Sequence, residues 1–262
     1  MIIRSLALKT ELGLAATRGV ITDRGNYVVI ETPDDPGYYY GNLLIAPAAP
    51  QAGEVATWID TFHREFRNPE IQHVTLCWDG TTGDVGCEAE LLAGGFRIER
   101  VLVLAATTVT APPVPNIVEL SPKQVIESEE LAWACADSHA EAFREFVQRR
   151  ARWQAQLVMR GLAKFFGIFD GTELVASLGL VPMGNLARYQ DVQTASTHRK
   201  RGYASALLAA AAAAVPAQSY VIIVDHASAA QRIYERAGFR IAERSSSAVL
   251  EPASARSSRS PS

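Results

Sequence analysis

The chain has few cysteines, little net charge and no long apolar run. A membrane span would need about 18 or more consecutive apolar residues, and no such run occurs. The first residues also lack the order of charged region, apolar run and small-residue cleavage site that marks a secretory signal peptide. We therefore predict a cytoplasmic protein with no membrane partner.

Cysteine is too scarce and too irregularly spaced for a disulfide framework or a zinc site. Cys77, Cys87 and Cys135 are odd in number, show no C-x-x-C spacing and have no paired histidine nearby. We expect three buried or incidental thiols and no bound metal ion.

The net charge of −3 is small, and it is unevenly divided along the chain. Residues 1–115 carry 8 Lys and Arg against 14 Asp and Glu, or −6, and residues 116–262 carry 17 against 14, or +3. Most of the positive excess falls in residues 199–201 and in the C-terminal tail. This is too little charge for a nucleic-acid surface, so we expect no nucleic-acid partner.

Composition and turn residues divide the chain into two domains. An apolar content of 48% with 20% charged residues is typical of a globular protein. Residues 107–115 end with three prolines in four positions, which cannot sustain a helix. We predict a domain at 1–110, a linker at 111–121, a second domain at 122–250 and a disordered tail at 251–262. Predicted helices span 6–17, 53–66, 88–93, 127–140, 141–160, 205–214 and 229–237, and predicted strands span 27–32, 38–45, 73–78, 96–105, 164–169, 173–182, 188–194 and 220–224, with a last strand after Gly238-Phe239.

The most informative stretch joins the strand at 188–194 to the alanine-rich helix at 205–214 through a basic turn. The common phosphate loops are missing, since neither G-x-x-x-x-G-K-[ST] nor G-x-G-x-x-G after a strand occurs. The pattern is instead Arg199-x-x-Gly202-x-Ala204. The free N–H groups and positive dipole of a helix start favour an anion, and a residue without Cβ permits a diphosphate to approach the backbone. Alone, the pattern also fits an ordinary solvated helix start.

With a second motif downstream, residues 122–250 resemble the GNAT acyltransferase superfamily. The second motif is Ile233-Tyr234-Glu-Arg-Ala-Gly238-Phe239, which looks like the family's aliphatic-Tyr-Glu-x-x-Gly-Phe segment. The resemblance implies an α/β fold with a twisted, mixed, mostly antiparallel sheet flanked by helices. It also implies acetyl-coenzyme A as co-substrate, an amine as acceptor and no metal.

The resemblance assigns roles to individual residues. Coenzyme binding falls on Val192, Gln193, Thr194, Arg199, Lys200, Arg201, Gly202, Tyr203, Ala204 and Ser205. Tyr234 is the candidate general acid for the departing thiolate, with packing against the coenzyme as the alternative. Phe143 and Trp153 lie in the acceptor region, although core packing explains them equally well. No general base is assigned: Asp191 is the only acid on the strand, and water can serve. His198 and His226 fit surface positions better than catalytic ones.

The first half repeats a feature of the second. Residues 90–98 echo 233–241, so that Gly95-Phe96 aligns with Gly238-Phe239 and Leu91 falls where Tyr234 stands. Residues 46–53 replace the basic turn. We therefore predict a degenerate GNAT-like copy that has lost its phosphate turn, with an unrelated small α/β domain as the alternative. In such a copy Trp58, Phe62 and Phe66 are expected to pack against the second domain or to wall the acceptor site.

The predicted function is N-acetyl transfer from acetyl-coenzyme A to an amine of a small molecule or a protein, by a monomer or homodimer. The alternatives are a coenzyme-binding sensor without catalysis and a purely structural tandem domain.

Overall fold

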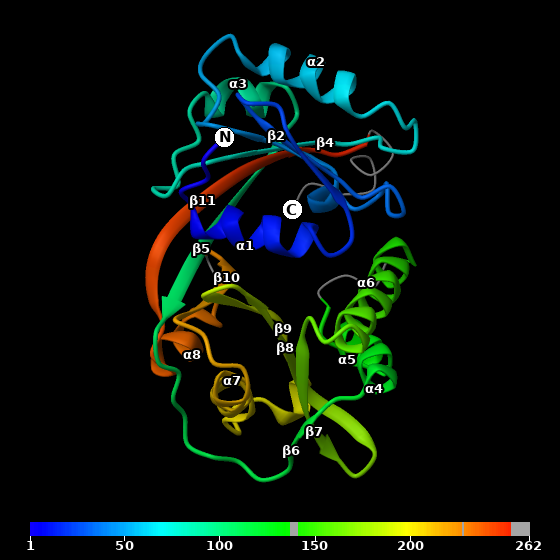
Figure 1. Cartoon of the computed structure of the whole chain (residues 1–262), viewed down its shortest axis with the longest axis vertical. Helices are drawn as coiled ribbons and strands as arrows, with labels where there is room; N and C mark the ends of the chain where they lie inside the picture. The colour runs from blue at the N-terminus through cyan, green and yellow to red at the C-terminus, as the bar shows by residue number, and fades with distance from the viewer. Residues whose placement is uncertain (137–140, 227, 253–262) are drawn as a thin grey trace. The chain divides into compact units, whose positions relative to one another are not determined.

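The computed structural model describes residues 1–136, 141–226 and 228–252 (Figure 1). The chain forms two compact units: Met1–Val103 together with the C-terminal residues from Glu243 on, and Leu104–Ala242. The C-terminal strand therefore ends in the first unit, whereas the sequence placed all of 122–250 in the second domain. Of the tail predicted to be disordered, residues 253–262 lie outside the described residues.

The described residues of the first unit contain six strands, one of them supplied by the C-terminal end of the chain. Its strands follow the order β1-β2-β3-β4-β11-β5. The β3–β4 pair is parallel, and β1–β2, β2–β3 and β4–β11 are antiparallel. The elements are α1 (Leu6–Ala15), β1 (Val20–Asp23), β2 (Val28–Glu31), a 3₁₀ turn (Tyr39–Gly41), β3 (Leu43–Ala46), α2 (Val55–Glu65), β4 (Val74–Trp78), α3 (Glu88–Ala93), β5 (Arg97–Ala106) and β11 (Arg240–Leu250).

Both faces of β2, β3 and β4 are buried, whereas β1 is mostly exposed. In Figure 1, α1 lies on one face and α2 and α3 lie on the other. Alternate residues of β2 and β3 accordingly join two different cores: Ile30 and Ile45 pack with Leu8 of α1, whereas Leu44 packs with Phe62 of α2. Burial on both faces explains why these strands are almost continuously apolar.

The apolar stripe of α2 belongs to the core of its own unit. Phe62 is 1% and Phe66 5% exposed, and Trp58 packs against the same cluster. The predicted stripe is confirmed, but the expectation that these three rings pack against the second domain is wrong. The three rings pack in the hydrophobic core of the first unit.

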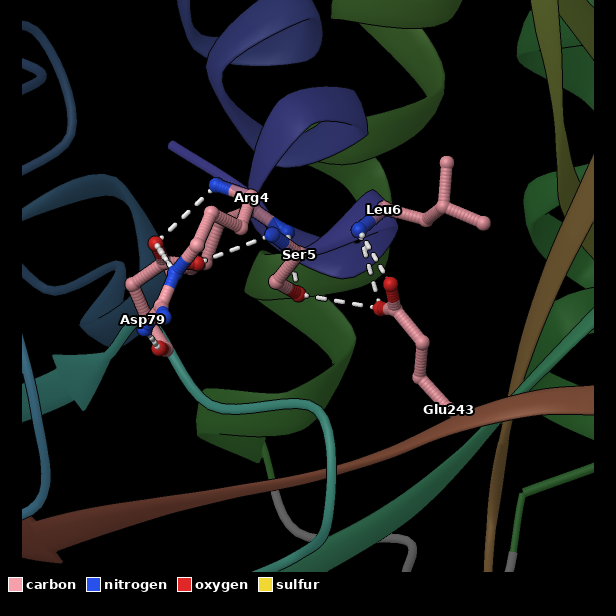
Figure 2. A network of polar contacts seen from close by, with 6 residues as sticks. Arg4, Ser5, Leu6, Asp79 and Glu243 are labelled. Carbon is pink, nitrogen blue, oxygen red and sulfur yellow. Dashed lines mark hydrogen bonds and ion pairs between the residues drawn. The ribbon is translucent and has the colours of Figure 1, made fainter. Parts of the chain in front are cut away.

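Two carboxylates hold the start of α1 (Figure 2). Asp79, just after β4, accepts hydrogen bonds from the backbone N–H groups of Arg4 at 2.9 Å and Ser5 at 2.8 Å. Glu243 of β11 accepts one from the Leu6 N–H at 2.8 Å and one from the Ser5 hydroxyl at 3.1 Å. Because the first N–H groups of a helix lack internal partners, carboxylates placed there stabilise it. The network joins α1, the end of β4 and the C-terminal strand.

The second unit follows the strand order β5-β10-β9-β8-β7-β6. The β6–β7, β7–β8 and β8–β9 pairs are antiparallel and β9–β10 is parallel, which confirms the predicted mixed, mostly antiparallel fold. In Figure 1, α7 lies on one face of these strands and α4, α5 and α6 lie on the other. The elements are β6 (Ile117–Glu119), α4 (Pro122–Glu127), α5 (Glu129–Ala134), α6 (Glu141–Met159), β7 (Lys164–Asp170), β8 (Glu173–Met183), β9 (Leu186–Thr194), a 3₁₀ turn (Ser196–His198), α7 (Tyr203–Ala214), β10 (Ser219–Asp225) and α8 (Gln231–Arg236).

One predicted helix differs from the structure for a local reason. The helix expected at 127–140 begins earlier, because Ser121 and Gln124 form a capping box that starts α4. It is then interrupted at Ser128, whose hydroxyl donates to the Val125 carbonyl at 2.7 Å and ends α4 before α5 begins. The predicted residues 137–140 lie outside the described residues.

Candidate active site

Strands β9 and β10 pair at one end and separate toward the other. Their parallel register runs from Leu186 opposite Ser219 to Arg188 opposite Val221. Both strands continue, to Thr194 and Asp225, but no further pairs join them in the described part of the chain. The edge of β9 that faces β10 thus has backbone groups available to a ligand, since backbone N–H and C=O groups require partners when buried.

A β-bulge lies at the point where β9 leaves its neighbour. Opposite β8, Gln190 pairs with Gly179 and Gln193 with Ser177, so β9 has one residue more than β8 across this step. Asp191 within the bulge has φ 48, in the left-handed region that residues other than glycine rarely adopt. Strained bulges of this kind occur next to active sites, where they redirect side chains and bend a strand.

The turn after β9 presents an open helix N-terminus. Gly202 is the N-cap of α7 with φ 81, and a Cβ added to it would meet no atom within 4 Å. The first bond of the helix runs from the Ala206 N–H to the Gly202 carbonyl at 3.0 Å. The preceding N–H groups of α7 therefore have no helical partner, and no side chain caps them. The sequence-predicted diphosphate position is accessible and carries the positive end of the helix dipole.

The basic residues of this turn are exposed, but they are not arranged alike. Lys200 has φ 64, another left-handed position, and Arg201 is exposed. Arg199 is directed back to the strand, where its Nε donates to the Thr194 carbonyl at 3.3 Å. Val192, Gln193 and Thr194 are half-buried along β9. The predicted coenzyme residues thus form one continuous surface from the end of β9 into α7.

The two histidines beside the motifs lie in ordinary structural surroundings. His198 Nε2 lies 3.0 Å from a carboxylate oxygen of Asp170, and its ring stacks on Tyr203. This contact fixes the turn. His226 is exposed just after β10.

Tyr234 is buried in α8. Its side chain is 6% exposed, and its ring meets Phe239 edge-on at 6.3 Å between centroids. Burial raises the pKa of the Tyr234 phenol to about 12. Its hydroxyl has no hydrogen-bond partner among the described residues. A phenol in this state is neutral at physiological pH and retains a proton to donate, but the same burial fits a packing role.

A cavity lies between α5, α6 and the strands β7 to β9. Its apolar wall is formed by Ala132, Phe143, Phe146, Val147, Ala151 and Phe165. Its polar wall is formed by Ser128, Glu129, Arg150, Gln154, Ser177, Asp191 and Gln193. The cavity reaches the β9 bulge, so a molecule bound there would lie beside the opening between β9 and β10. Of the two residues expected in the acceptor region, Phe143 lines this cavity, whereas Trp153 is not among its lining residues.

An ion pair crosses the polar side of the cavity. The Asp191 carboxylate contacts the Arg150 guanidinium through one oxygen and the Gln154 side-chain amide through the other. Gln154 is 3% exposed, and the side chains of Asp191 and Arg150 are 19% and 35% exposed. Both partners come from one face of α6. Asp191 is therefore held rather than free, so it does not stand as an unengaged base.

Sequence reasoning missed Arg150, Gln154 and Glu129 as site residues. A signal for the first two was present: residues 143, 146, 147, 150, 151 and 154 recur at helical spacing, and an arginine and a glutamine interrupt this otherwise apolar stripe. Polar groups within a buried stripe point to a site more strongly than its aromatic residues do.

The two halves share a detailed backbone feature. The Phe96 N–H donates to the Leu91 carbonyl at 3.0 Å, and the Phe239 N–H donates to the Tyr234 carbonyl at 3.1 Å. Between them Gly95 and Gly238 both have positive φ, at 82 and 107. These are the same helix-ending bond and the same left-handed glycine.

In the first half, carboxylates of the protein itself bind backbone N–H groups just before α2, the helix that corresponds to α7. The Gly53 N–H donates to Glu90 at 2.8 Å and the Gln51 N–H donates to Glu54 at 2.9 Å, both just before α2. Leu91, which stands where Tyr234 does, is fully buried. Two N–H groups of the turn before α2 are thus satisfied, and two carboxylates lie beside a helix start that no side chain caps.

The described residues contain no group of three or more His, Cys, Asp or Glu side chains arranged to hold a metal ion. The three cysteines are free thiols, and burial raises the pKa of the Cys77 thiol above its usual range. No helix in the described ranges has the length and apolarity needed to cross a membrane.

Comparison with protein families matches residues 121–248 to the acetyltransferase (GNAT) domain. No curated protein matches the sequence. Among solved structures, a functionally unknown conserved protein from Staphylococcus epidermidis ATCC 12228 is 12% identical, covers 89% of this chain and 94% of its own, and gives a TM-score of 0.75. A GCN5-related N-acetyltransferase from Kribbella flavida is 15% identical over 96% of this chain and 97% of its own, with a TM-score of 0.65. A tandem GNAT protein from the clavulanic acid biosynthesis pathway is 15% identical over 80% of this chain and 75% of its own, with a TM-score of 0.53. At these identities the likeness is one of fold.

Proposed function

Because residues 121–248 form an acetyltransferase domain of the GNAT superfamily, we propose that this protein transfers an acetyl group from acetyl-coenzyme A to the nitrogen of an amine. The observation that carries the proposal is the parting of β9 from β10 directly before an uncapped helix start. The edge of β9 has backbone groups available to a ligand. The start of α7 has free N–H donors, and Gly202 has no Cβ that would block a ligand from reaching them.

The residues present fit a ligand that has a diphosphate and an amide-containing arm. The N–H groups of Tyr203, Ala204 and Ser205 would bind phosphate oxygens, with Lys200 and Arg201 adding positive charge. The backbone of Val192, Gln193 and Thr194 would pair with the amide arm as an additional strand would. Arg199 would hold the carboxyl end of β9 in place through the Thr194 carbonyl.

Acyl transfer from a thioester also requires a proton for the leaving thiolate and a neutral amine. Tyr234 is the candidate donor of that proton, because it is protonated at physiological pH and its hydroxyl is unengaged in the described structure. Burial that raises its pKa weakens it as an acid, so it must lie against the sulfur to act. For the amine we assign no protein base, since both oxygens of Asp191 are engaged.

We further propose that the first half is a decayed copy without coenzyme. Its support is the shared bond at Phe96 and Phe239, together with the carboxylates Glu54 and Glu90 at the start of α2. These two carboxylates would repel a negatively charged diphosphate, and the N–H groups of Gln51 and Gly53 already have partners. The protein would then carry one coenzyme, on the second unit, and act as a monomer or homodimer on a small-molecule or protein amine.

The rival function is a sensor that binds the coenzyme without catalysis, and a third is a purely structural role. Calorimetric titration of the full chain with acetyl-coenzyme A separates the structural role from the other two, because a structural protein gives no binding at millimolar ligand. Thiol release on addition of an amine panel then separates the enzyme from the sensor. Coenzyme binding with no release for any amine would refute catalysis.

A further inference from the structure

The polar wall of the cavity beside β9 contains charges of both signs, and they are unequally engaged. The Arg150 guanidinium has five N–H donors; among the described residues its ion-pair partner is the Asp191 carboxylate, and it also lies over the Phe146 ring at 5.8 Å from the centroid. Its side chain is 35% exposed where it lines the cavity. Donors are therefore left over on an accessible cation that the fold keeps beside the bulge.

One of the two carboxylates in this wall has no partner in the described residues. Asp191 is oriented by Arg150 and by the buried Gln154. Glu129 of α5 lines the same cavity and has no partner in the described parts of the chain. The rings of Phe143, Phe146 and Phe165 also line the cavity, and the Phe146 ring lies beside the Arg150 guanidinium. A ligand that matches this wall has one negative group, one positive group and an apolar body.

We propose that the acceptor is an α-amino acid with an apolar side chain, an inference that rests on the acetyl transfer proposed above. The carboxylate of the amino acid binds the spare donors of Arg150, because a guanidinium fork matches a carboxylate better than any other side chain does. The amino group, arriving as an ammonium ion, lies against Asp191 and Glu129. The apolar side chain packs on the three phenylalanine rings.

The alternation of charges favours this acceptor over a simple amine. An amine without a carboxylate would place its cation near the Arg150 guanidinium and leave the spare donors of that guanidinium unmatched. An amino acid instead completes a ring in which each positive group touches a negative one: Arg150, Asp191, the ammonium and the carboxylate. Its nitrogen then lies at the bulge, where β9 parts from β10.

In the chemical step the amine nitrogen, after losing a proton to water, forms a bond to the thioester carbonyl carbon. The carbon–sulfur bond breaks and the sulfur leaves with the electron pair. The nitrogen gives up its second proton and the thiolate takes up one, so the products are an N-acetyl amino acid and the free thiol. No oxidant, reductant or metal enters. Arg150 acts here as a specificity-determining residue that touches the acceptor.

The test compares four compounds of one shape on the full-length protein, with acetyl-coenzyme A and thiol release as the readout. They are L-phenylalanine, 2-phenylethylamine without the carboxylate, L-phenylalaninamide with a neutral group in its place, and 3-phenylpropionate without the amine. We expect kcat/KM for L-phenylalanine to exceed that of the amine and the amide by on the order of 10-fold or more. We expect 3-phenylpropionate to inhibit competitively.

Two variants assign the effect to the guanidinium. Arg150→Gln should lower kcat/KM for L-phenylalanine on the order of 10- to 100-fold, mainly through KM, and should not lower kcat/KM for 2-phenylethylamine, whose ammonium group no longer lies near a guanidinium. The matched control is Arg149→Gln, the neighbouring residue, which contacts Glu145 at 3.8 Å and does not line the cavity. A thermal shift with acetyl-coenzyme A shows that both variants are folded.

Failure of this inference is distinct from failure of the proposed function. If 2-phenylethylamine reacts as fast as L-phenylalanine, or if Arg150→Gln weakens both equally, the amino acid assignment is wrong although the protein is an acetyltransferase. If acetyl-coenzyme A does not bind, or if no amine of a broad panel releases thiol, the enzymatic function itself is refuted.

Discussion

Substitution of Gly202 tests the diphosphate position with a control that the chain supplies. Gly202 has φ 81 with open space at its missing Cβ, and Gly171, in the β7–β8 hairpin, has φ 61 with equally open space. Alanine at either position imposes the left-handed conformation on a residue with Cβ, which costs about 1–2 kcal/mol. Gly202→Ala and Gly171→Ala should therefore lose similar amounts of unfolding free energy.

Their effects on the coenzyme should differ. The methyl of Gly202→Ala stands where the diphosphate approaches, so we expect acetyl-coenzyme A to bind about 10-fold more weakly, whereas Gly171→Ala should bind it as wild type does. Gly202→Glu adds a longer side chain and a negative charge at the same point. Two unit charges about 4 Å apart near a surface interact by about 4 kcal/mol, so the loss should reach at least 100-fold.

Isothermal titration of the four proteins, after denaturant melts that confirm the fold, gives both quantities. Equal affinity of wild type and Gly202→Glu would show that the diphosphate lies elsewhere. Equal weakening by Gly171→Ala and Gly202→Ala would show that lost stability, rather than lost access, is the cause.

Three further predictions concern single side chains. If the Tyr234 phenol is the general acid, Tyr234→Phe should lower turnover about 10²- to 10⁴-fold in the thiol-release assay with little change in coenzyme affinity. Turnover close to that of wild type would assign the Tyr234 side chain to packing. Asp79→Ala removes the acceptor for two backbone N–H groups at the start of α1. Urea melts should show a loss of about 3–5 kcal/mol in the free energy of unfolding, and hydrogen exchange of the amides in α1 should become faster. Unchanged exchange would contradict the role given to this carboxylate. Burial lowers the pKa of His73 below its unfolded value of about 6.5, so its contribution to stability is present above that pH and is lost as the pH falls below it. Denaturant melts at several pH values should therefore show that His73→Gln flattens the acid side of the stability curve, and an unchanged curve would contradict this role.

Much of the fold could be predicted because local chemistry and tertiary packing agree. The stripe on α2, the Asp170-Gly171 hairpin and the alanine-rich α7 each combine a clear pattern with the matching environment. Two short edge strands, β1 and β6, escaped prediction, since strands of 4 and 3 residues that contain no buried residue have little periodicity to detect. The membership of β11 could not be foreseen, because its partner strand is remote in sequence.

In the candidate site, too, the parts set by local sequence could be predicted and the parts that join remote elements could not. The turn at Gly202 is local, and a short motif describes it. The cavity is not local: Glu129, Arg150 and Asp191 come from α5, α6 and β9, and only the bulge turns Asp191 toward Arg150. A bulge has no sequence signature when the extra residue is an aspartate, so the pairing of these charges was invisible in the sequence.

The placement of β11 affects how the chain is made. Ser247 pairs with Cys77, and the difference 247 − 77 gives 170 residues between the partners. At about 5–20 residues per second, β4 leaves the ribosome some 8–34 s before its partner is synthesised. Throughout that interval the edge of Val74–Trp78, whose residues are all buried in the finished unit, has no strand beside it. Chaperones that shield such an edge during translation should therefore raise the yield of this protein, and slow translation past residue 78 should lower it.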